Sequence, residues 1–493
     1  MRYCIESSFF TALTASIFFF KTIDIRLLID NYAAPVNESN RNITSCLITN
    51  ILILGNGYMK RTTSALIHAI QFAVIGAALV PCTASATNGL FMIGYGTPSR
   101  GMGGVAIAHP ADSISGVANP ANVSQVGNRF DVGMDLFTAD VTGQLGSVTT
   151  PSNVDLFKVD NLFPMPAVGY TDSLNEKYSF GVSMIPAGGG AVHYDTNFYQ
   201  AAAGGDTSEE LSVALIISQV HLSLAYKMNK QNSFGVSLIT GIQVFSAKGI
   251  QLFDPFTQTN GTNTGFSNQG YDWSFGLGAK VGWLGTFNDL KVGVAYQTKV
   301  YMQDFDKYTE LFADHGNFDT PANIGAGISY DIKPEWSVAA DITYTYYEGV
   351  KALSNPGPNL AGNPSGVMDP LTQSLGLPGG LGFGWSNQTV YKIGTEYAFN
   401  EKWTGRAGWN YAKSPIDENT KIIFNLLAPA IAQNHLTLGG TYRMSPTMEI
   451  NGSFVHAFKF KQAGPTYVSD DGSNLGSLEM EQNSLGASFS MKF

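Results

Sequence analysis

The larger, C-terminal part of the chain alternates between apolar and polar positions in a series of separate segments. The alternation is clearest in 272–283, 403–411 and 435–444, where one face is apolar with aromatic ends and the other is small, polar or charged. A period of two is typical of half-buried β-strands. Many segments reach roughly ten residues, which exceeds the usual length of globular strands and suits a strand tilted across a membrane. The pattern therefore predicts membrane-spanning strands.

Short turns and long loops alternate between the predicted strands. We place about fourteen strands, which begin near residues 129, 165, 178, 213, 233, 271, 290, 318, 336, 387, 403, 434, 448 and 483. The short turns are 173–177, 229–232, 286–289, 332–335, 400–402 and 445–447; the long loops lie near 145–164, 189–212, 249–270, 304–317, 351–386, 413–432 and 461–482. Outer-membrane barrels have this asymmetry, and an even strand number puts both chain ends on the periplasmic side. We predict an all-β fold, a transmembrane antiparallel β-barrel of about 14 strands over residues 129–493.

The composition agrees with a barrel better than with other classes. Only 13% of the 493 residues are charged, against about 25% in soluble domains. Mean hydropathy is +0.01, far below that of a helical membrane protein. The net charge of -10 leaves no basic footprint for nucleic acid, so we expect no nucleic-acid partner.

Residues 59–86 have the three parts of a secretory signal peptide. Lys60 lies in a positively charged start, residues 66–80 are apolar, and residues 84–86 read Ala-Ser-Ala, a cleavage motif. We predict cleavage after Ala86, which makes Thr87 the first residue of the mature protein. The sequence therefore predicts export.

Residues 1–58 precede this complete signal peptide. We interpret them as a mis-assigned N-terminal extension, with Met59 as the initiator; an unusually long leader is the alternative. The chain's cysteines, Cys4, Cys46 and Cys82, all precede the cleavage site, so the mature chain would hold no disulfide and no thiol site. A lipoprotein attached through Cys82 is less consistent with the proline before it.

The stretch 87–128 is rich in Gly, Ala and Pro, carries little charge and has no lasting periodicity. It is too apolar for a disordered tail, whose composition favours charge. A barrel of about fourteen strands is too wide for inward side chains alone to fill. We predict that residues 87–128 form a plug, or hatch, inside the lumen.

This stretch also carries a family resemblance. The sequence GYGTPSRGMGGVAIAHPADSISGVANPANVSQVG, centred on Asn119, Pro120 and Ala121, resembles the N-terminal hatch of the FadL/TodX (OmpP1) family of outer-membrane transporters of long-chain fatty acids and hydrocarbons. Further segments match in kind and order, among them AYKMNKQNSFGVSL, RAGWNYAKSPIDE and NHLTLGGTYRM. The resemblance implies a fourteen-stranded barrel closed by a hatch, and passive uptake of a hydrophobic ligand that leaves sideways through a gap at a kinked third strand.

The third predicted strand contains a physical reason for such a gap. Pro186 has no N–H to give to a ladder, and Gly188, Gly189 and Gly190 weaken the pairing beyond it. The resemblance implies that Asn119, Pro120 and Ala121 lie against this kink. The alternative is that Pro186 simply ends the strand and that the glycines begin a loop.

The predicted long loops 351–386 and 413–432 are unusually apolar, which suits either an entrance for a hydrophobic ligand or a cap that packs on itself. A fatty acid would also need a cation for its carboxylate. Lys248 and Lys351, at the ends of the fifth and ninth predicted strands, are candidates by position. Because so few cations are available, an uncharged hydrocarbon stays open as the ligand.

The last segment alternates up to a terminal Phe493, an end typical of chains handled by the outer-membrane assembly machinery. We expect partners of three kinds: a hydrophobic small molecule, outer-membrane lipids or detergent, and the assembly machinery. We expect a monomer in the outer membrane of a Gram-negative bacterium, with no cofactor, no metal and no catalytic residue. A general diffusion porin is the main alternative function, and an outer-membrane lipase is a further one.

Overall fold

In the computed structural model, the described residues are 88–144, 162–194, 197, 199–200, 208–258, 265–356, 374–416, 422–465 and 475–493. The predicted signal peptide and the extension over residues 1–58 lie outside these ranges. The described residues belong to one compact unit, Gln71–Phe493. Among them no helix is both long enough and apolar enough to cross a bilayer.

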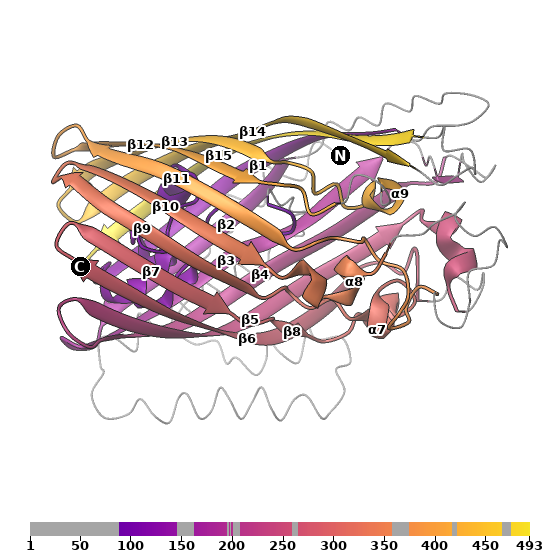
Figure 1. Cartoon of the computed structure of the whole chain (residues 1–493), viewed down its shortest axis with the longest axis horizontal. Helices are drawn as coiled ribbons and strands as arrows, with labels where there is room; N and C mark the ends of the chain where they lie inside the picture. The colour runs from indigo at the N-terminus through magenta and orange to yellow at the C-terminus, as the bar shows by residue number, and fades with distance from the viewer. Residues whose placement is uncertain are drawn as a thin grey trace, which may run out of the picture. The chain divides into compact units, whose positions relative to one another are not determined.

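Antiparallel strands make up most of this unit (Figure 1). They are β1 (Arg129–Gln144), β2 (Leu162–Ser173), β3 (Tyr178–Tyr194), β4 (Leu211–Lys227), β5 (Asn232–Lys248), β6 (Asp272–Phe287), β7 (Leu290–Gln297), β8 (Tyr301–Met302), β9 (Asn323–Lys333), β10 (Trp336–Thr345), β11 (Gln388–Ala398), β12 (Trp403–Ala412), β13 (Asn434–Ser445), β14 (Met448–Pro465) and β15 (Leu475–Lys492).

The strands close into a barrel. Apart from the two-residue β8, which pairs with β6, each strand pairs with the strands before and after it, and β9 pairs with β7. β1 pairs with β15 and so joins the two ends of the chain. Both β7 and β8 pair with β6, with a register shift of one residue between them, so they occupy one strand position. Fifteen strands thus fill fourteen positions, and the predicted fourteen-stranded antiparallel barrel is confirmed.

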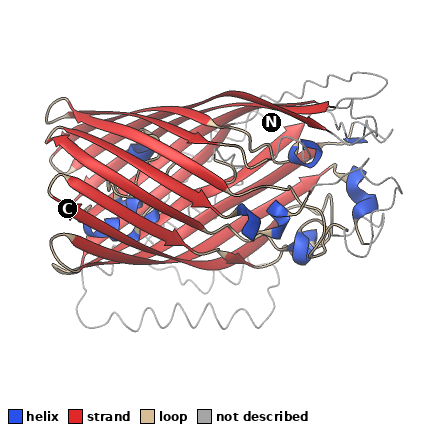
Figure 2. Cartoon of the chain, viewed as in Figure 1, coloured by secondary structure: helices blue, strands red, loops and turns tan. Residues whose placement is uncertain are grey.

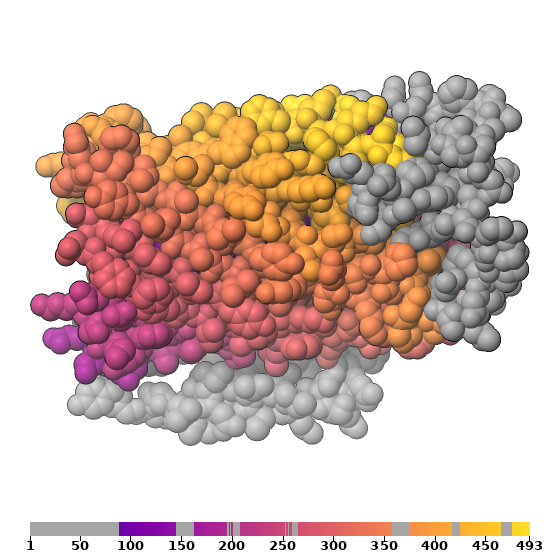
Figure 3. Space-filling view, in the orientation of Figure 1, coloured from indigo at the N-terminus to yellow at the C-terminus, as the bar shows by residue number. Residues whose placement is uncertain are grey.

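Side chains alternate across the barrel wall as the sequence predicts. On β5 the apolar Phe234, Val236 and Leu238 are exposed, whereas Ser233 and Ser237, which alternate with them, are buried. Side chains cover the outer face of the strands in the space-filling view (Figure 3). An apolar outside and a small or polar inside are what a barrel in lipid requires.

Aromatic side chains gather on the outer face near the strand ends. At the short-turn end, Trp403 packs against Tyr442 with ring centroids 4.6 Å apart. Toward the other end, the rings of Trp409 and Phe458 are 5.9 Å apart. Such rings suit the two membrane interfaces.

Three strand boundaries differ from the prediction. β3 continues to Tyr194 in a ladder with β4, into residues placed in the loop 189–212, so the alternative in which Pro186 ends the strand is wrong. β9 begins at Asn323, five residues later than placed, and β15 begins at Leu475, eight residues earlier. β3 and β15 extend beyond the regular alternation, in segments rich in small residues, and neighbouring strands supply the hydrogen bonds there.

Residues 88–128 lie within the barrel and contain α5 (Thr97–Arg100), η1 (Ser113–Val117) and η2 (Pro120–Ser124). Figure 2 draws these short helices in blue among the strands, toward the end where the C-terminus lies. Buried charge anchors the segment to the wall: Arg100 pairs with Asp135 of β1 at 3.0 Å, and Ser113 donates its backbone N–H to Asp131 at 2.8 Å. We call residues 88–128 the hatch segment.

The long loops pack together at the opposite end of the barrel. Their short helices are η3 (Gln251–Phe256), η4 (Asp306–Tyr308), α7 (Ala313–Gly316), η5 (Tyr347–Gly349), α8 (Lys351–Ser354) and α9 (Ile422–Asn425). Leu353, Leu375, Phe383, Phe424 and Leu427 belong to one buried apolar cluster there. The apolar loop residues that the structure describes therefore cover one another.

Candidate functional site

The ladder between β2 and β3 is short. It runs from Ser173 opposite Ser179 to Val168 opposite Met184. β3 continues for ten residues beyond Met184, with a register shift against β4 between Pro186 and Gly188. Over that length the described pairings of β3 are with β4 and with the hatch segment, and none is with β2.

The start of the hatch segment meets β3 at this break. Phe91 forms a β-bridge with Gly188, and the N–H of Gly189 donates to the carbonyl of Leu90 at 3.0 Å. Any Cβ at Gly188 would collide with the carbonyl oxygen of Leu90. Tyr95 donates its hydroxyl to the carbonyl of Ala187 at 2.8 Å. The glycines therefore give the hatch segment room to approach β3.

The motif Asn119, Pro120 and Ala121 lies elsewhere. The Asn119 amide donates to the carbonyl of Trp283 on β6 at 2.9 Å and to that of Ile107 at 3.0 Å, and its oxygen accepts the N–H of Ala121 at 3.1 Å. Pro120 and Ala121 pack against Gly235 of β5.

The expected contact of this motif with the β3 kink is therefore replaced by contacts with β5 and β6. The reason is steric, because Gly235 of β5 and Gly282 of β6 have no Cβ: one at Gly235 would collide with Ala121, and one at Gly282 with Asn119. Leu90 and Phe91 take the place at the kink that the resemblance gives to the motif.

Tyr347 of η5 holds the hatch segment from the loop side. Its buried hydroxyl accepts the N–H of Leu90 and donates to the carbonyl of Asn88, each at 2.9 Å. Burial raises the pKa of the Tyr347 hydroxyl far above its ordinary value, so the hydroxyl stays protonated and donates. The ring also packs edge-on against Trp385, with centroids 5.3 Å apart. Tyr347 thus connects the loops with the segment that meets β3.

An apolar cavity of about 60 Å³ lies between the loops and this break. Leu90, Gly189 and Gly190 line one side of it, and Phe383 and Trp385 line another. No Cβ at Gly190 would meet an atom within 4 Å, so space is open there. The remaining lining residues are Gly89, Ala191, Val213, Leu215, Phe245, Phe312, Phe318, Leu353, Leu427, Ala428, Pro429, Ala430 and Met480.

The two lysines proposed for a ligand carboxylate do not line this cavity. Lys248 pairs with Glu210 at 3.0 Å, and Lys351 pairs with Asp314 at 3.0 Å. Their side chains are 46% and 50% exposed, so both pairs lie in solvent. Their role with a ligand stays a prediction, and each lysine already has an anionic partner.

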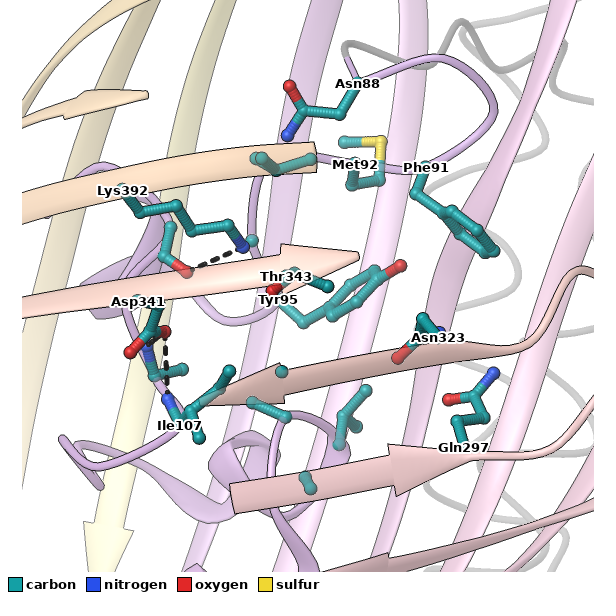
Figure 4. Close-up of a pocket in the computed structure, with 18 of the residues that line it drawn as sticks. Asn88, Phe91, Met92, Tyr95, Ile107, Gln297, Asn323, Asp341, Thr343 and Lys392 are labelled. Atoms are coloured by element: carbon teal, nitrogen blue, oxygen red, sulfur yellow. Dashed lines mark hydrogen bonds between the residues drawn. The ribbon is translucent and has the colours of Figure 1, made fainter. Parts of the chain in front are cut away.

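A second, polar cavity of about 90 Å³ lies on the other side of the hatch segment's start (Figure 4). Lys392 and Asp341 face it from neighbouring strands. Asp341 accepts the N–H of Ile107 at 3.0 Å, and Lys392 donates to the carbonyl of Gly104 at 3.2 Å. These side chains therefore hold the hatch segment and also border open space.

Sequence reasoning missed Tyr347 and Leu90. Tyr347 ends a run of tyrosines, 344, 346 and 347, in which nothing marks one residue as buried. Leu90 precedes the glycine-rich motif that carried the resemblance. Among the described residues no cluster of three or more His, Cys, Asp or Glu could hold a metal ion.

Comparison with known proteins gives one consistent result. A family model described as "Outer membrane protein transport protein (OMPP1/FadL/TodX)" matches residues 82–493. The long-chain fatty acid transport protein of Escherichia coli strain K12 is 23% identical over 436 residues, covering 77% of this chain and 89% of that protein. The protein of the same name from Salmonella typhi is 22% identical over 425 residues, covering 77% and 89%.

Solved structures share the fold. The Pseudomonas putida toluene transporter TodX superposes with a TM-score of 0.61 at 19% identity, covering 81% of this chain and 99% of that one. The Ralstonia pickettii toluene transporter TbuX gives a TM-score of 0.57 at 18% identity, with coverage of 81% and 99%. These relatives are transporters, not enzymes.

Proposed function

The chain belongs to the outer-membrane transport protein family (OMPP1/FadL/TodX), and from that premise we propose that it takes up small hydrophobic molecules by passive diffusion. It is an outer-membrane β-barrel. The observation that carries the proposal is the apolar cavity beside the interrupted ladder between β2 and β3. Leu90, Gly189 and Gly190 belong to both features. A ligand in that cavity is thus next to the stretch of wall in which β2 and β3 are not paired.

The proposed route is lateral. The ligand enters through the apolar loops, rests against Phe383 and Trp385, and leaves between β2 and β3. Pro186 and Gly188–Gly190 keep that part of β3 free of a β2 ladder. Leu90 and Phe91 lie against β3 at the break and close the exit in this structure. Movement of these two residues away from β3 would open it. Passage through the side wall takes the ligand directly into lipid. A water-filled pore would leave its apolar surface in water, where it gains no hydrophobic free energy.

The cavity favours an uncharged ligand. None of the described residues that line it carries a charge. Among them, the one side chain with an N–H donor is Trp385, which gives that N–H to Asn425 at 2.7 Å. Burying a carboxylate without a partner is costly. Of the two ligand classes in the relatives' names, long-chain fatty acids and toluene, the second matches this lining better.

A general diffusion porin fits these residues less well, because the buried hatch segment bonds to strands around the lumen, whereas a porin needs an open polar eyelet. An enzymatic role has little support, since the relatives are transporters and the cavity lining offers no nucleophile with a base. We therefore propose a transporter without catalytic activity.

The test measures uptake of radiolabelled toluene and oleate by cells that carry the protein or its Gly190→Phe variant. Because Gly190 borders open space, the added ring should fill the exit and reduce toluene uptake about tenfold or more. Gly452→Phe is the matched control, since Gly452 faces outward on β14, away from the cavity. Equal toluene uptake by both variants and the native chain would contradict the lateral route. Uptake of neither ligand by the native chain would contradict the function itself.

A further inference from the structure

A large polar cavity opens at the short-turn end of the barrel, the periplasmic side. Its volume is about 640 Å³. Its lining includes Lys333 and Glu335 at the turn between β9 and β10, and Glu396 and Arg406 on the wall. His109 of the hatch segment lies at its inner end. We call this cavity the vestibule, and the polar cavity of Figure 4 the lumen cavity.

The lumen cavity and the vestibule lie one above the other along the same strands. On β11, Lys392 lines the lumen cavity and Glu396 lines the vestibule. On β10, Asp341 likewise lines the lumen cavity and Ser337 lines the vestibule. Residues four apart on a strand share a face and are about 13 Å apart along it. The two polar spaces are therefore separated by one thin layer of the molecule.

That layer is apolar. Met102, Val105 and Ala339 form a hydrophobic cluster of their own, with exposed fractions of 1%, 1% and 4%. Met102 packs on Gly394, which lies midway between Lys392 and Glu396 on β11. We call Met102, Val105 and Ala339 the septum. It is separate from the large apolar cluster that joins the loops to β3.

Polar side chains of the wall hold the backbone of the septum in place. Asp341 accepts the N–H of Ala106 at 2.8 Å, directly after Val105. Thr437 accepts the N–H of Gly103 at 2.7 Å, directly after Met102. The backbone that carries the septum thus depends on side-chain bonds to β10 and β13.

Two glycines let this backbone lie against the wall. Gly103 and Gly104 have φ of +73° and +80°, which favours glycine. A Cβ at Gly103 would lie 2.8 Å from the carbonyl oxygen of Ile393 on β11. The backbone that follows has no regular secondary structure between residues 105 and 112, so side-chain hydrogen bonds such as those with Asp341 and Lys392 hold it.

The lumen cavity has the features of a hydrated space. Among its lining residues, Asp341 Oδ1, Gln219 Nε2 and Asn88 Oδ1 are buried atoms that have no hydrogen-bond partner in the part of the chain that the structure describes. Buried polar groups in native proteins are bonded to protein or water. A volume of about 90 Å³ admits several waters by the criterion of roughly 10–15 Å³ for one. Water on both sides of an apolar layer is the arrangement of a hydrophobic gate.

We propose that Met102, Val105 and Ala339 form a hydrophobic gate on an axial, polar path for water and small hydrophilic solutes. This path runs along the β9–β13 side of the barrel and is distinct from the apolar side exit at β3. It is closed in this structure. The lumen cavity has two lysines, Lys280 and Lys392, and one acid, Asp341, in its lining, so an open path would prefer anions.

The test makes the septum polar and measures ion conductance of the purified full-length barrel in planar bilayers. The native chain should show no steady conductance. Val105→Thr keeps the side-chain volume but introduces a hydroxyl, and Met102→Gln keeps the side-chain length but introduces an amide. Both variants should produce conductance steps at least tenfold above background. In a KCl gradient their reversal potential should indicate preference for chloride.

Val123→Thr is the matched control. Val123 is a buried valine of the hatch segment that packs on Gly181 of β3, away from the septum. Folding of each variant is checked by the heat-dependent shift in electrophoretic mobility that folded barrels show. Conductance in Val123→Thr equal to that in Val105→Thr would overturn the gate, because it would mean general loosening.

Background conductance in both folded septum variants would also overturn the gate. Toluene uptake separates this proposal from the proposed function. Folded Val105→Thr should take up toluene at the native rate, since the two routes are distinct. Loss of toluene uptake together with a gain in conductance would overturn the separation of the routes. No toluene uptake by any variant or by the native chain would refute the transport function and leave the gate to be judged by conductance alone.

Discussion

The hydroxyl of Tyr347 accepts a hydrogen bond from the backbone N–H of Leu90 at 2.9 Å, although 257 residues separate the two in sequence. Leu90 in turn accepts the N–H of Gly189 at the break in the β2–β3 ladder. The loop that ends β10 is thereby connected, through one tyrosine and one hatch residue, to the proposed exit. Trp385, which lines the apolar cavity, packs against the ring of Tyr347 and is therefore in contact with this connection.

Tyr347→Phe removes the hydroxyl and keeps the ring. We expect the backbone of residues 88–91 to open more often, since a buried N–H and carbonyl lose their partner, at a cost of about 1–3 kcal/mol. Hydrogen exchange at the Leu90 amide should become at least about tenfold faster. Mass spectrometry of the barrel in detergent measures this directly.

Tyr308→Phe is the control for that experiment. Tyr308 is another buried loop tyrosine, which bonds to Ala247 and Gly270 rather than to the hatch segment. Its variant should leave exchange at residues 88–91 unchanged. Equal acceleration in the two variants would mean that loosening of the loops, not the loss of the Tyr347 bond, frees the hatch segment.

The barrel could be predicted from sequence because lipid enforces alternation. Outward Trp273 and Phe275 alternate with inward Ser274 on β6 as the pattern indicates. The prediction fails where that constraint ends. Beyond Met184, β3 leaves its ladder with β2 and is bonded by β4 and by Leu90, so its residues no longer alternate between lipid and lumen.

The site was harder to predict because its contacts join residues far apart in sequence. The position of Asn119 depends on two glycines, Gly235 and Gly282, that matter only once β5 and β6 are adjacent. Asp341 could be assigned to the lumen by its period, but its bonds to Ala106 and Ile107 follow from the path of a segment without periodicity. The local pattern of the sequence therefore predicts the strands of the barrel, but not the contacts between the strands and the hatch segment.

Asn119→Ala should destabilise the hatch segment. The substitution leaves the carbonyls of Ile107 and Trp283 and the N–H of Ala121 without their partner in a fully buried place. We expect a loss of about 1–3 kcal/mol in the free energy of unfolding, measured by urea titration in detergent. Asn229→Ala, at an exposed turn, should lose less than about 1 kcal/mol. Equal losses would contradict the anchoring role of Asn119.

Asp112 should make the hatch segment less stable as pH rises. Burial first, and then the neighbouring charge of Asp131, raises the pKa of Asp112 to about 6 from its ordinary 3.8. The folded chain thus binds the proton more tightly than the unfolded chain, so ionisation between pH 4 and 6 favours unfolding. Asp112→Asn, which keeps an acceptor for the N–H of Ile114, should match the native chain at pH 4. It should be more stable at pH 7.5, by on the order of 3 kcal/mol, which is what a rise in pKa from 3.8 to about 6 corresponds to. A stability difference that does not change with pH would contradict the raised pKa.

A cation placed in the apolar cavity should change which ligand binds. Phe383 lines that cavity, and Phe383→Lys puts an ammonium group where the native lining has no charge. A charge-assisted hydrogen bond contributes about 1.5–3 kcal/mol, so oleate should bind at least tenfold more tightly to the variant than to the native chain. Toluene should bind more weakly, because the ammonium must lose its hydration without compensation. Phe383→Leu is the control, since it removes the ring without adding charge and should weaken both ligands alike. One result would contradict the assignment of an uncharged ligand: the native chain binds oleate more tightly than toluene, and Phe383→Lys leaves the ratio of the two dissociation constants unchanged. The carboxylate would then be held outside this cavity.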